Sequence, residues 1–166
     1  LKELEALVDE AHLHGLLVGA HAHATQAIVN SLDAGVDMLI HCTFIQPDGT
    51  IQFDQRIGDR VASSETWVNP TLYVAQSWVE ELEAKREMGG LTKEEERRLE
   101  LNRAKSEDRV QVCSQLIKAG ASVIGGSDCG FGAYPFGHFD RELNAMVQAG
   151  LSSKEALLAG TKNAAK

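Results

Sequence analysis

Three residues with metal-binding side chains come at the ends of short apolar runs in the sequence. His21 and His41 each follow such a run directly, and Asp128 follows a later run after one serine. Imidazole and carboxylate together suit Zn²⁺ and related divalent ions, and a catalytic site keeps one position open for water. The bound metal lowers the pKa of that water to about 7, so hydroxide becomes available at neutral pH. The pattern predicts a divalent-metal site, with zinc as the expected ion.

The other histidines have less specific surroundings. A single histidine at a strand end is more often a hydrogen-bonded structural residue than a ligand, so the prediction depends on three such positions occurring in order. His23 lies two residues beyond His21 and would share its face on an extended chain, pointing either inward or toward a substrate. His138, in a loop rich in glycine and aromatic residues, is either a substrate contact or a solvated residue. His12 and His14 lie near a predicted helix C-terminus, which favours surface roles.

The apolar runs that carry these residues have the length and composition of buried parallel strands. They are too short for core helices and lack alternation, while helical spacing of apolar residues returns between them. Alternating strands and helices predict a parallel sheet with right-handed crossovers, in which functional residues collect at the carboxyl ends of the strands. The expected strands are Leu16–Ala20, Val36–Ile40, Thr66–Leu72 and Ala121–Gly126, and the expected helices include Leu1–His14, Ala24–Ala34, Phe53–Val61 and Arg141–Gln148.

Four strand and helix units make half of a (β/α)₈ barrel, which needs roughly 250 residues when complete. The expected fold class is therefore α/β, a partial TIM barrel, in a single fragment that spans residues 1–166. A half-barrel leaves two strand edges unpaired and its inner face uncovered. We therefore expect either a homo-oligomer or a missing barrel half. The chain starts without Met and inside a helical pattern, which favours a piece of a longer protein and leaves a removed signal peptide open.

A strongly charged stretch interrupts the regular pattern between Trp78 and Lys118. Acidic and basic residues are interleaved along it, Gly89-Gly90 breaks it, and Thr92-x-x-Glu95 has the form of a capping box that opens a second helix. The stretch predicts a helical hairpin inserted at about residues 76–118.

Composition limits the class of protein and its partners. The chain has 166 residues, 43% of them hydrophobic and 24% charged, and a formal net charge of −8. The acidic balance argues against non-specific nucleic-acid binding, which needs a basic face. No apolar stretch approaches the roughly 20 residues that span a bilayer, so no membrane partner is expected. Three cysteines without C-x-x-C spacing indicate reduced thiols and a cytoplasmic location.

Five sequence blocks together resemble the metal-dependent amidohydrolase superfamily, in particular the branch of imidazolonepropionase-like proteins and Xaa-Pro dipeptidases. The match covers nearly the whole chain, and the ordered set is more specific than any one block. The blocks are Val18-Gly19-Ala20-His21-Ala22-His23-Ala24, the run Gly35 to Phe44 that contains His41, Asn69-Pro70-Thr71-Leu72, Gly125-Gly126-Ser127-Asp128 and the terminal Thr161 to Lys166.

The resemblance implies that the chain holds barrel strands five to eight. His21 then corresponds to the metal ligand of strand five, His41 to that of strand six, and Asp128 to the carboxylate of strand eight, which binds metal and takes a proton from the attacking water. The resemblance gives no fixed role to His23. From their positions in the sequence, we expect His23, Tyr73 and His138 to contact the substrate. The implied activity is hydrolysis of a C–N bond in a cyclic amide, amide or dipeptide by a metal-activated water.

This chain lacks several sequence features that the family pattern includes. The strand-one His-x-His pair, the strand-four lysine and the small β-sandwich domain are not in it. Much of the coordination would be missing, so we expect one or two metal ions in the parent protein and an isolated chain with little or no activity.

Two alternative interpretations of the sequence remain open. The chain could be a non-catalytic module that uses its strand edges and acidic hairpin to self-associate or to bind a partner. It could also be another barrel enzyme, such as an aldolase or a phosphate-binding isomerase. That class needs an active-site lysine or a glycine-rich loop at a helix start, and neither Lys118 nor Gly125-Gly126-Ser127 is suitably placed.

Overall fold

The computed structural model describes residues 1–165 and contains a parallel sheet flanked by helices. Its strands are β1 (Gly19–Ala24), β2 (Met38–Ile45) and β3 (Trp67–Asn69), which lie in that spatial order and run parallel. The expected α/β class with a parallel sheet is confirmed. Lys166, the last residue of the terminal sequence block, lies outside the described residues.

The fourth predicted strand is reduced to one parallel bridge. Val68 of β3 donates its N–H to the carbonyl of Ser122 at 2.8 Å and accepts from Ile124 at 2.9 Å, which pairs it with Val123. The predicted extent, Ala121–Gly126, is therefore too long. The N–H of Gly125 donates to the carbonyl of Ala159 at 3.0 Å, so the backbone turns toward the C-terminal helices and leaves the sheet.

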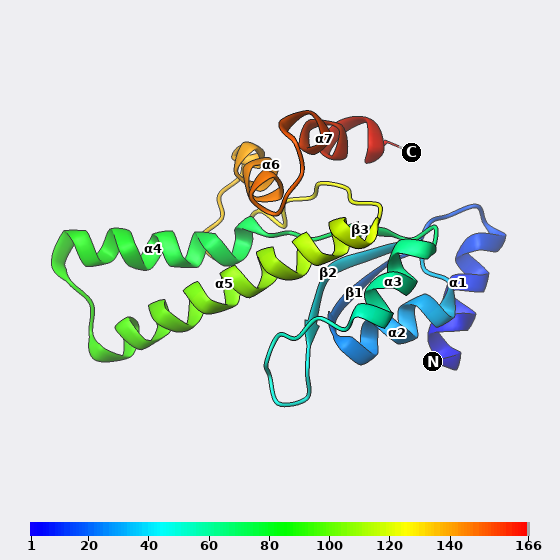
Figure 1. Cartoon of the computed structure of the whole chain (residues 1–166), viewed down its shortest axis with the longest axis horizontal. Helices are drawn as coiled ribbons and strands as arrows, with labels where there is room; N and C mark the ends of the chain where they lie inside the picture. Colours follow the sequence, from blue (N-terminus) through cyan, green and yellow to red (C-terminus); the bar gives the residue numbers. More distant parts are fainter. Residues whose placement is uncertain (166) are drawn as a thin grey trace.

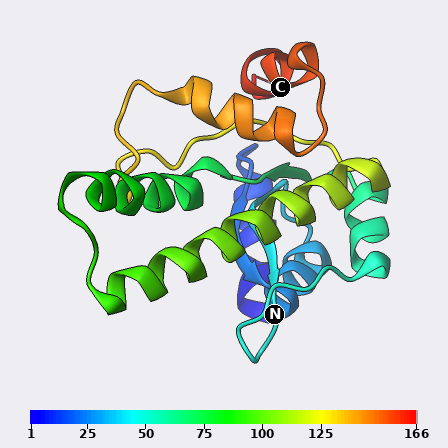
Figure 2. The ribbon, with the colours of Figure 1, turned by 60° about the vertical axis from the view of Figure 1, so that its left-hand side comes forward.

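Helices alternate with the strands as predicted and form three groups around the sheet. In Figure 1, α1, α2 and α3 lie beside the strands, α4 and α5 form a long projecting hairpin, and α6 and α7 lie together over its base. Figure 2 shows α5 crossing the molecule in front of the strands. The bounds are α1 Lys2–Leu13, α2 Thr25–Ala34, α3 Gln55–Ser63, α4 Tyr73–Gly89, α5 Lys93–Ala119, α6 Phe139–Gln148 and α7 Ser153–Leu158, followed by the π-helical turn η1 Ala159–Asn163. Among residues 1–165, no helix has the length and apolar character needed to cross a membrane.

The first strand begins and ends later than predicted. Asp37 holds the segment before it, since its carboxylate accepts the N–H of Val18 at 2.7 Å and lies 2.9 Å from Nε2 of His12. Leu16 and Leu17 therefore belong to a connection and are 62% and 75% exposed. As a result His21 and His23 lie within β1, two residues apart on one face, and not beyond its end.

The two larger clusters of buried residues both include side chains of α5. Ile28 of α2, Leu39 of β2 and Leu116 of α5 belong to the cluster that covers the sheet. Cys113, also on α5, belongs to a second cluster with Met146 of α6 and parts of α4 and α7. Because α5 packs on both clusters, it fixes the C-terminal helices relative to the strand ends.

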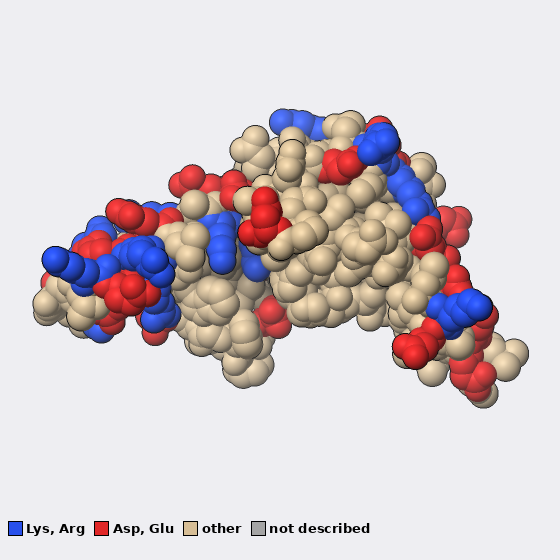
Figure 3. Space-filling view, turned by 90° about the horizontal axis from the view of Figure 1, so that it is seen from below, with Lys and Arg blue, Asp and Glu red and all other residues tan. Residues whose placement is uncertain are grey.

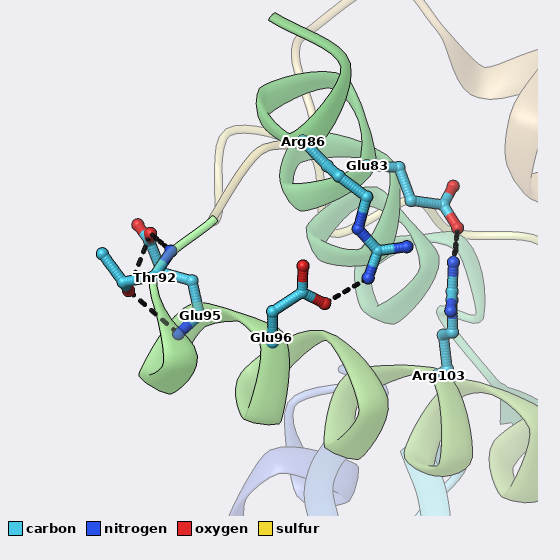
Figure 4. A network of polar contacts seen from close by, with 6 residues as sticks. All are labelled: Glu83, Arg86, Thr92, Glu95, Glu96 and Arg103. Atoms are coloured by element: carbon cyan, nitrogen blue, oxygen red, sulfur yellow. Dashed lines mark hydrogen bonds and ion pairs between the residues drawn. The ribbon is translucent and has the colours of Figure 1, made fainter. Parts of the chain in front are cut away.

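The hairpin formed by α4 and α5 is joined by polar contacts between its arms. Glu83 accepts from Arg103 at 2.5 Å, and Arg86 pairs with Glu96 (Figure 4). The predicted capping box is present, with Thr92 and Glu95 exchanging side-chain to backbone hydrogen bonds. Figure 3 shows charges of both signs crowded over the projecting end of the hairpin, whereas the middle of this face is mostly neutral.

Removing the cap of α5 should loosen the hairpin. We expect Thr92→Ala to destabilise the chain by about 1 kcal/mol, because the N–H of Glu95 loses its acceptor. Thermal unfolding and amide exchange at Glu95 measure this change. The control is Lys93→Ala at the neighbouring position, and equal behaviour of the two variants would contradict the prediction.

Candidate metal centre

Three imidazoles from two neighbouring strands converge at one point. His21 and His23 project from β1 and His41 from β2, and their ring centroids are 4.2 to 4.6 Å apart. One nitrogen from each ring can be chosen so that all three lie within 4.8 Å of one another. We refer to His21, His23 and His41 as the histidine group.

His41 reaches this group because the backbone of β2 leaves regular strand geometry. The register pairs Ala22 with His41, and paired residues normally share a face, yet Ala22 is buried on the opposite side from His21 and His23. His41 has φ of +73° and Cys42 of +50°. These left-handed conformations cost of order 1–3 kcal/mol each for residues other than glycine. They turn the His41 imidazole toward the histidines of β1.

Hydrogen bonds hold His41 from both of its nitrogens. Its Nδ1 lies 2.5 Å from Oγ1 of Thr71, and its Nε2 lies 3.2 Å from Nδ1 of His21. His41 and Thr71 are 7% and 1% exposed, so water does not compete for the first contact. Nε2 is the nitrogen that faces the other histidines.

The hydrogen bonds of Thr43 determine which nitrogen of His23 is free. The hydroxyl of Thr43 donates its one proton to the carbonyl of His23 at 3.2 Å, and Nδ1 of His23 lies 2.8 Å from the same oxygen. The Nδ1–H must therefore donate to Thr43, because the hydroxyl has no second proton. Nε2 of His23 then carries a lone pair that is available to a metal ion.

Burial and neighbouring charges keep two of the three imidazoles neutral. Burial lowers the pKa of His41 to about 4, with His21 and Arg109 acting in the same direction. Burial likewise lowers the pKa of His23 to about 4, assisted by His41, Arg109 and His21 and opposed by Asp128. A neutral imidazole is the form that binds metal, so His41 and His23 are in their ligating state at pH 7.

The neutrality of His41 predicts a pH-dependent stability difference. Its folded pKa of about 4 lies below the ordinary value of 6.5, so the unfolded chain binds the proton first. Stability is then fully present above pH 6.5 and is lost as the pH falls toward 4, by about 2 to 3 kcal/mol. Urea unfolding with a chelator present should show the advantage of wild type over His41→Gln growing from pH 4 to 6.5. Parallel stability curves would contradict this expectation.

Arg109 of α5 acts on the histidine group through its charge, and sequence reasoning missed it. Burial lowers its pKa, while Asp128 raises it, and its charge acts on both His23 and His41. It lies in the charged hairpin stretch, where an arginine is ordinarily solvated. The available signal was helical spacing, since residues 109, 112, 113 and 116 repeat at intervals of three and four and the last three are buried.

Asp128 does not lie in the histidine group. It is exposed, has φ of +53° and follows the bridge at Val123 in a loop that runs to residue 138. Its charge nevertheless raises the pKa of both His23 and Arg109.

Tyr73 and His138 line a separate cavity of about 350 Å³ together with Glu80 and Arg141. The hydroxyl of Tyr73 donates to Oε2 of Glu80 at 2.6 Å, and burial followed by this bond raises the pKa of Tyr73 to about 12. The guanidinium of Arg141 lies 5.8 Å from the centre of the Tyr73 ring. The structure thus brings two of the three expected substrate contacts together and places the third, His23, in the histidine group. A larger cavity of about 600 Å³ between α4 and α5 contains none of these residues.

The donor set fits a divalent ion of the zinc type. The three imidazole nitrogens can approach one another within 4.8 Å, burial keeps two of the rings neutral, and both of these rings bond to a threonine hydroxyl through Nδ1. Such a partner on the second nitrogen is the usual way in which proteins orient a ligating histidine.

The parallel sheet thus carries a histidine group on β1 and β2 that is a candidate metal centre. The chain belongs to the amidohydrolase family, whose model matches residues 1–166. An ochratoxinase from Aspergillus niger is 28% identical over 98% of this chain and 30% of its own length. The structure of the A. niger ochratoxinase matches with a TM-score of 0.70 at 26% identity, over 98% of this chain and 32% of that one.

Two further structures show the same fold. A protein from Bifidobacterium longum described as a prolidase gives a TM-score of 0.72 at 29% identity, over 98% of this chain and 38% of that one. A Xaa-Pro dipeptidase with bound methionine gives 0.68 at 23% identity, with 98% and 36% covered. The chain spans about a third of the length of these relatives. The expected family is confirmed, including its similarity to the Xaa-Pro dipeptidase branch.

Proposed function

We propose that this chain contains strands five to eight of an amidohydrolase barrel and contributes part of a metal centre that hydrolyses a C–N bond. The observation that carries the proposal is the convergence of His21, His23 and His41. Family membership and the names of the relatives, prolidase and ochratoxinase, support an amide or dipeptide as the substrate class.

The residues have distinct roles in this proposal. His21, His23 and His41 hold a divalent ion, which when bound supplies an acidified water. Thr71 and Thr43 orient two of the rings through their Nδ1 atoms. Asp128 accepts a proton from water and passes it to the leaving nitrogen, as a general base within hydrogen-bond reach would.

The substrate is bounded by the loop that begins at Asp128 and by the start of α4. Tyr73 and His138 line the small cavity there. Among residues 1–165, the ion pairs of Arg141 are long, at 3.7 Å to Glu80 and 4.0 Å to Asp140. Its guanidinium therefore retains N–H groups for a carboxylate such as that of a dipeptide. The hairpin, at about residues 76–118, is an insertion in the barrel under this proposal.

A second candidate function is assembly. β1 forms the edge of the sheet, and Leu13, Leu16 and Leu17 beside it are strongly exposed. These features suit a surface covered by the other half of a barrel or by a second copy of the chain. The isolated chain would then be inactive. Separately, the cytoplasmic location of the protein stays a prediction.

The test compares the chain alone with the full-length protein. Metal content after size-exclusion chromatography should approach stoichiometry in the full-length protein, which should cleave Xaa-Pro dipeptides or simple amides. Turnover by the isolated chain would contradict the claim that it holds only part of the active site. A metal-loaded full-length protein that cleaves neither substrate would contradict the proposed hydrolase activity. An isolated chain that forms stable oligomers without metal would favour assembly.

A further inference from the structure

Glu142 of α6 is a fully buried carboxylate that none of the proposed catalytic steps uses. It is 0% exposed, and its two oxygens accept the N–H groups of Leu72 at 2.9 Å and Tyr73 at 2.7 Å. Burial raises its pKa to about 7, against the lowering effect of these two bonds. Leu72 is the N-cap of α4 and has no side-chain cap of its own. Glu142 therefore caps α4 from another helix.

The capped residues adjoin the contact that orients His41. Thr71, directly before Leu72, has φ of +46° and is 1% exposed. A threonine keeps such a conformation only where its surroundings enforce it. The two hydrogen bonds to Glu142 fix the peptide units that follow Thr71, and its Oγ1 lies 2.5 Å from Nδ1 of His41.

Backbone groups, and not a cationic side chain, hold the carboxylate of Glu142 within residues 1–165. Asp128 raises the pKa of Glu142, and Glu142 in turn raises the pKa of Cys113 and of Tyr134. All three of these neighbours are acidic or neutral groups. The backbone N–H groups at the start of α4 are thus the interactions that stabilise the carboxylate, and the helix dipole acts in the same direction. The carboxylate and the turn at residues 71–73 depend on each other.

We propose that Glu142 is a positioning residue for the metal centre, which acts on His41 through the turn at residues 71–73. By fixing the Thr71 hydroxyl on Nδ1, it directs Nε2 of His41 toward His21. The inference rests on the proposed metal site, and it concerns Glu142 of α6, which belongs neither to the histidine group nor to the lining of the small cavity.

Glu142→Gln tests this role with little change in size. The glutamine amide has one oxygen, which can accept only one of the N–H groups of Leu72 and Tyr73 in this geometry. Its N–H₂ group then faces the remaining N–H as donor against donor, so the turn loses a hydrogen bond. Zinc affinity, measured by competition with a chromophoric chelator, should fall at least about tenfold, as for other residues that orient ligands. Thr71→Val should weaken zinc binding by a similar factor, and the double variant should be no weaker than the worse single variant.

The matched control is Glu155→Gln. Glu155 also caps a helix, accepting the N–H of Ser152 at 2.8 Å, but it belongs to α7 and is exposed. It should leave zinc affinity unchanged even if stability falls. Equal zinc affinities of Glu142→Gln, Glu155→Gln and wild type would overturn the proposal.

A second readout does not require metal. In the metal-free wild type, ¹⁵N NMR of the imidazoles should show one predominant tautomer for His41, and Glu142→Gln should shift it toward a mixture while Glu155→Gln should not. If wild type binds no zinc, the metal centre fails, and the tautomer still decides the positioning role. If Glu142→Gln does not fold, the coupling is tested with His41→Gln instead. Hydrogen exchange of the amides of Leu72 and Tyr73 should then be faster in His41→Gln than in wild type. Unchanged exchange would overturn the coupling.

Discussion

His41→Ala is expected to reduce zinc affinity by more than about a hundredfold. His41 is the most buried member of the histidine group and the one held from both nitrogens, so no other side chain can take its place. Removing a ligand should cost more than removing a residue that orients one, for which about ten- to a hundredfold is typical. Competition titration of the metal-free chain with zinc measures the effect directly.

The same titration decides between two ligand sets. If the histidine group binds the ion, His23→Ala should weaken zinc binding strongly and Asp128→Ala should have a smaller effect. If the ligands are His21, His41 and Asp128, as the sequence predicts, the order is reversed. His14→Ala is the matched control, because His14 is exposed and pairs only with Glu10 at 3.1 Å. Wild-type affinity in His41→Ala would exclude the site.

The order of helices and strands could be predicted because it depends on local sequence patterns. Apolar runs marked the strands, and the capping box at Thr92 marked the start of α5. Glycines follow α2 and α5 directly, and Gly35 and Gly120 adopt left-handed conformations there. The end of the fourth strand could not be predicted, because it depends on the bond between Gly125 and Ala159. That contact joins distant parts of the sequence.

The candidate site was predictable in type but not in membership. His21 and His41 stand out because they follow apolar runs, and His23 shares a face with His21. Strand alternation alone would place His41 on the face of the sheet opposite His21 and His23. The left-handed backbone conformations in β2 bring it to the same side as these two histidines. Arg109 and Glu142 reach the site region by helix packing. For Arg109, helical spacing with the buried Val112, Cys113 and Leu116 is the one local difference from a solvated charge.

Gly126→Ala should have the second large effect, because the side chain of Asn69 occupies the space beside residue 126. A Cβ there would lie 2.9 Å from Cγ of Asn69 and nearer still to its amide nitrogen. Either Asn69 or the segment that leads to Asp128 must move. Overpacking of this kind costs about 1–3 kcal/mol, which lowers Tm by roughly 2–4 °C per kcal/mol in a chain of this size. Gly89→Ala is the control, since a Cβ at that position would have no neighbouring atom within 4 Å.

Asn69→Ala should rescue Gly126→Ala if the amide is the obstacle. Among residues 1–165, Oδ1 of Asn69 is the one buried side-chain oxygen or nitrogen without a hydrogen-bond partner, so its removal leaves no donor unpaired there. The double variant should be more stable than Gly126→Ala, with a coupling energy of about 1 kcal/mol in a double-mutant cycle. Additive losses would mean that the backbone of 121–126, and not Asn69, resists the methyl group. Position 126 would then act on Asp128 through the backbone that joins them.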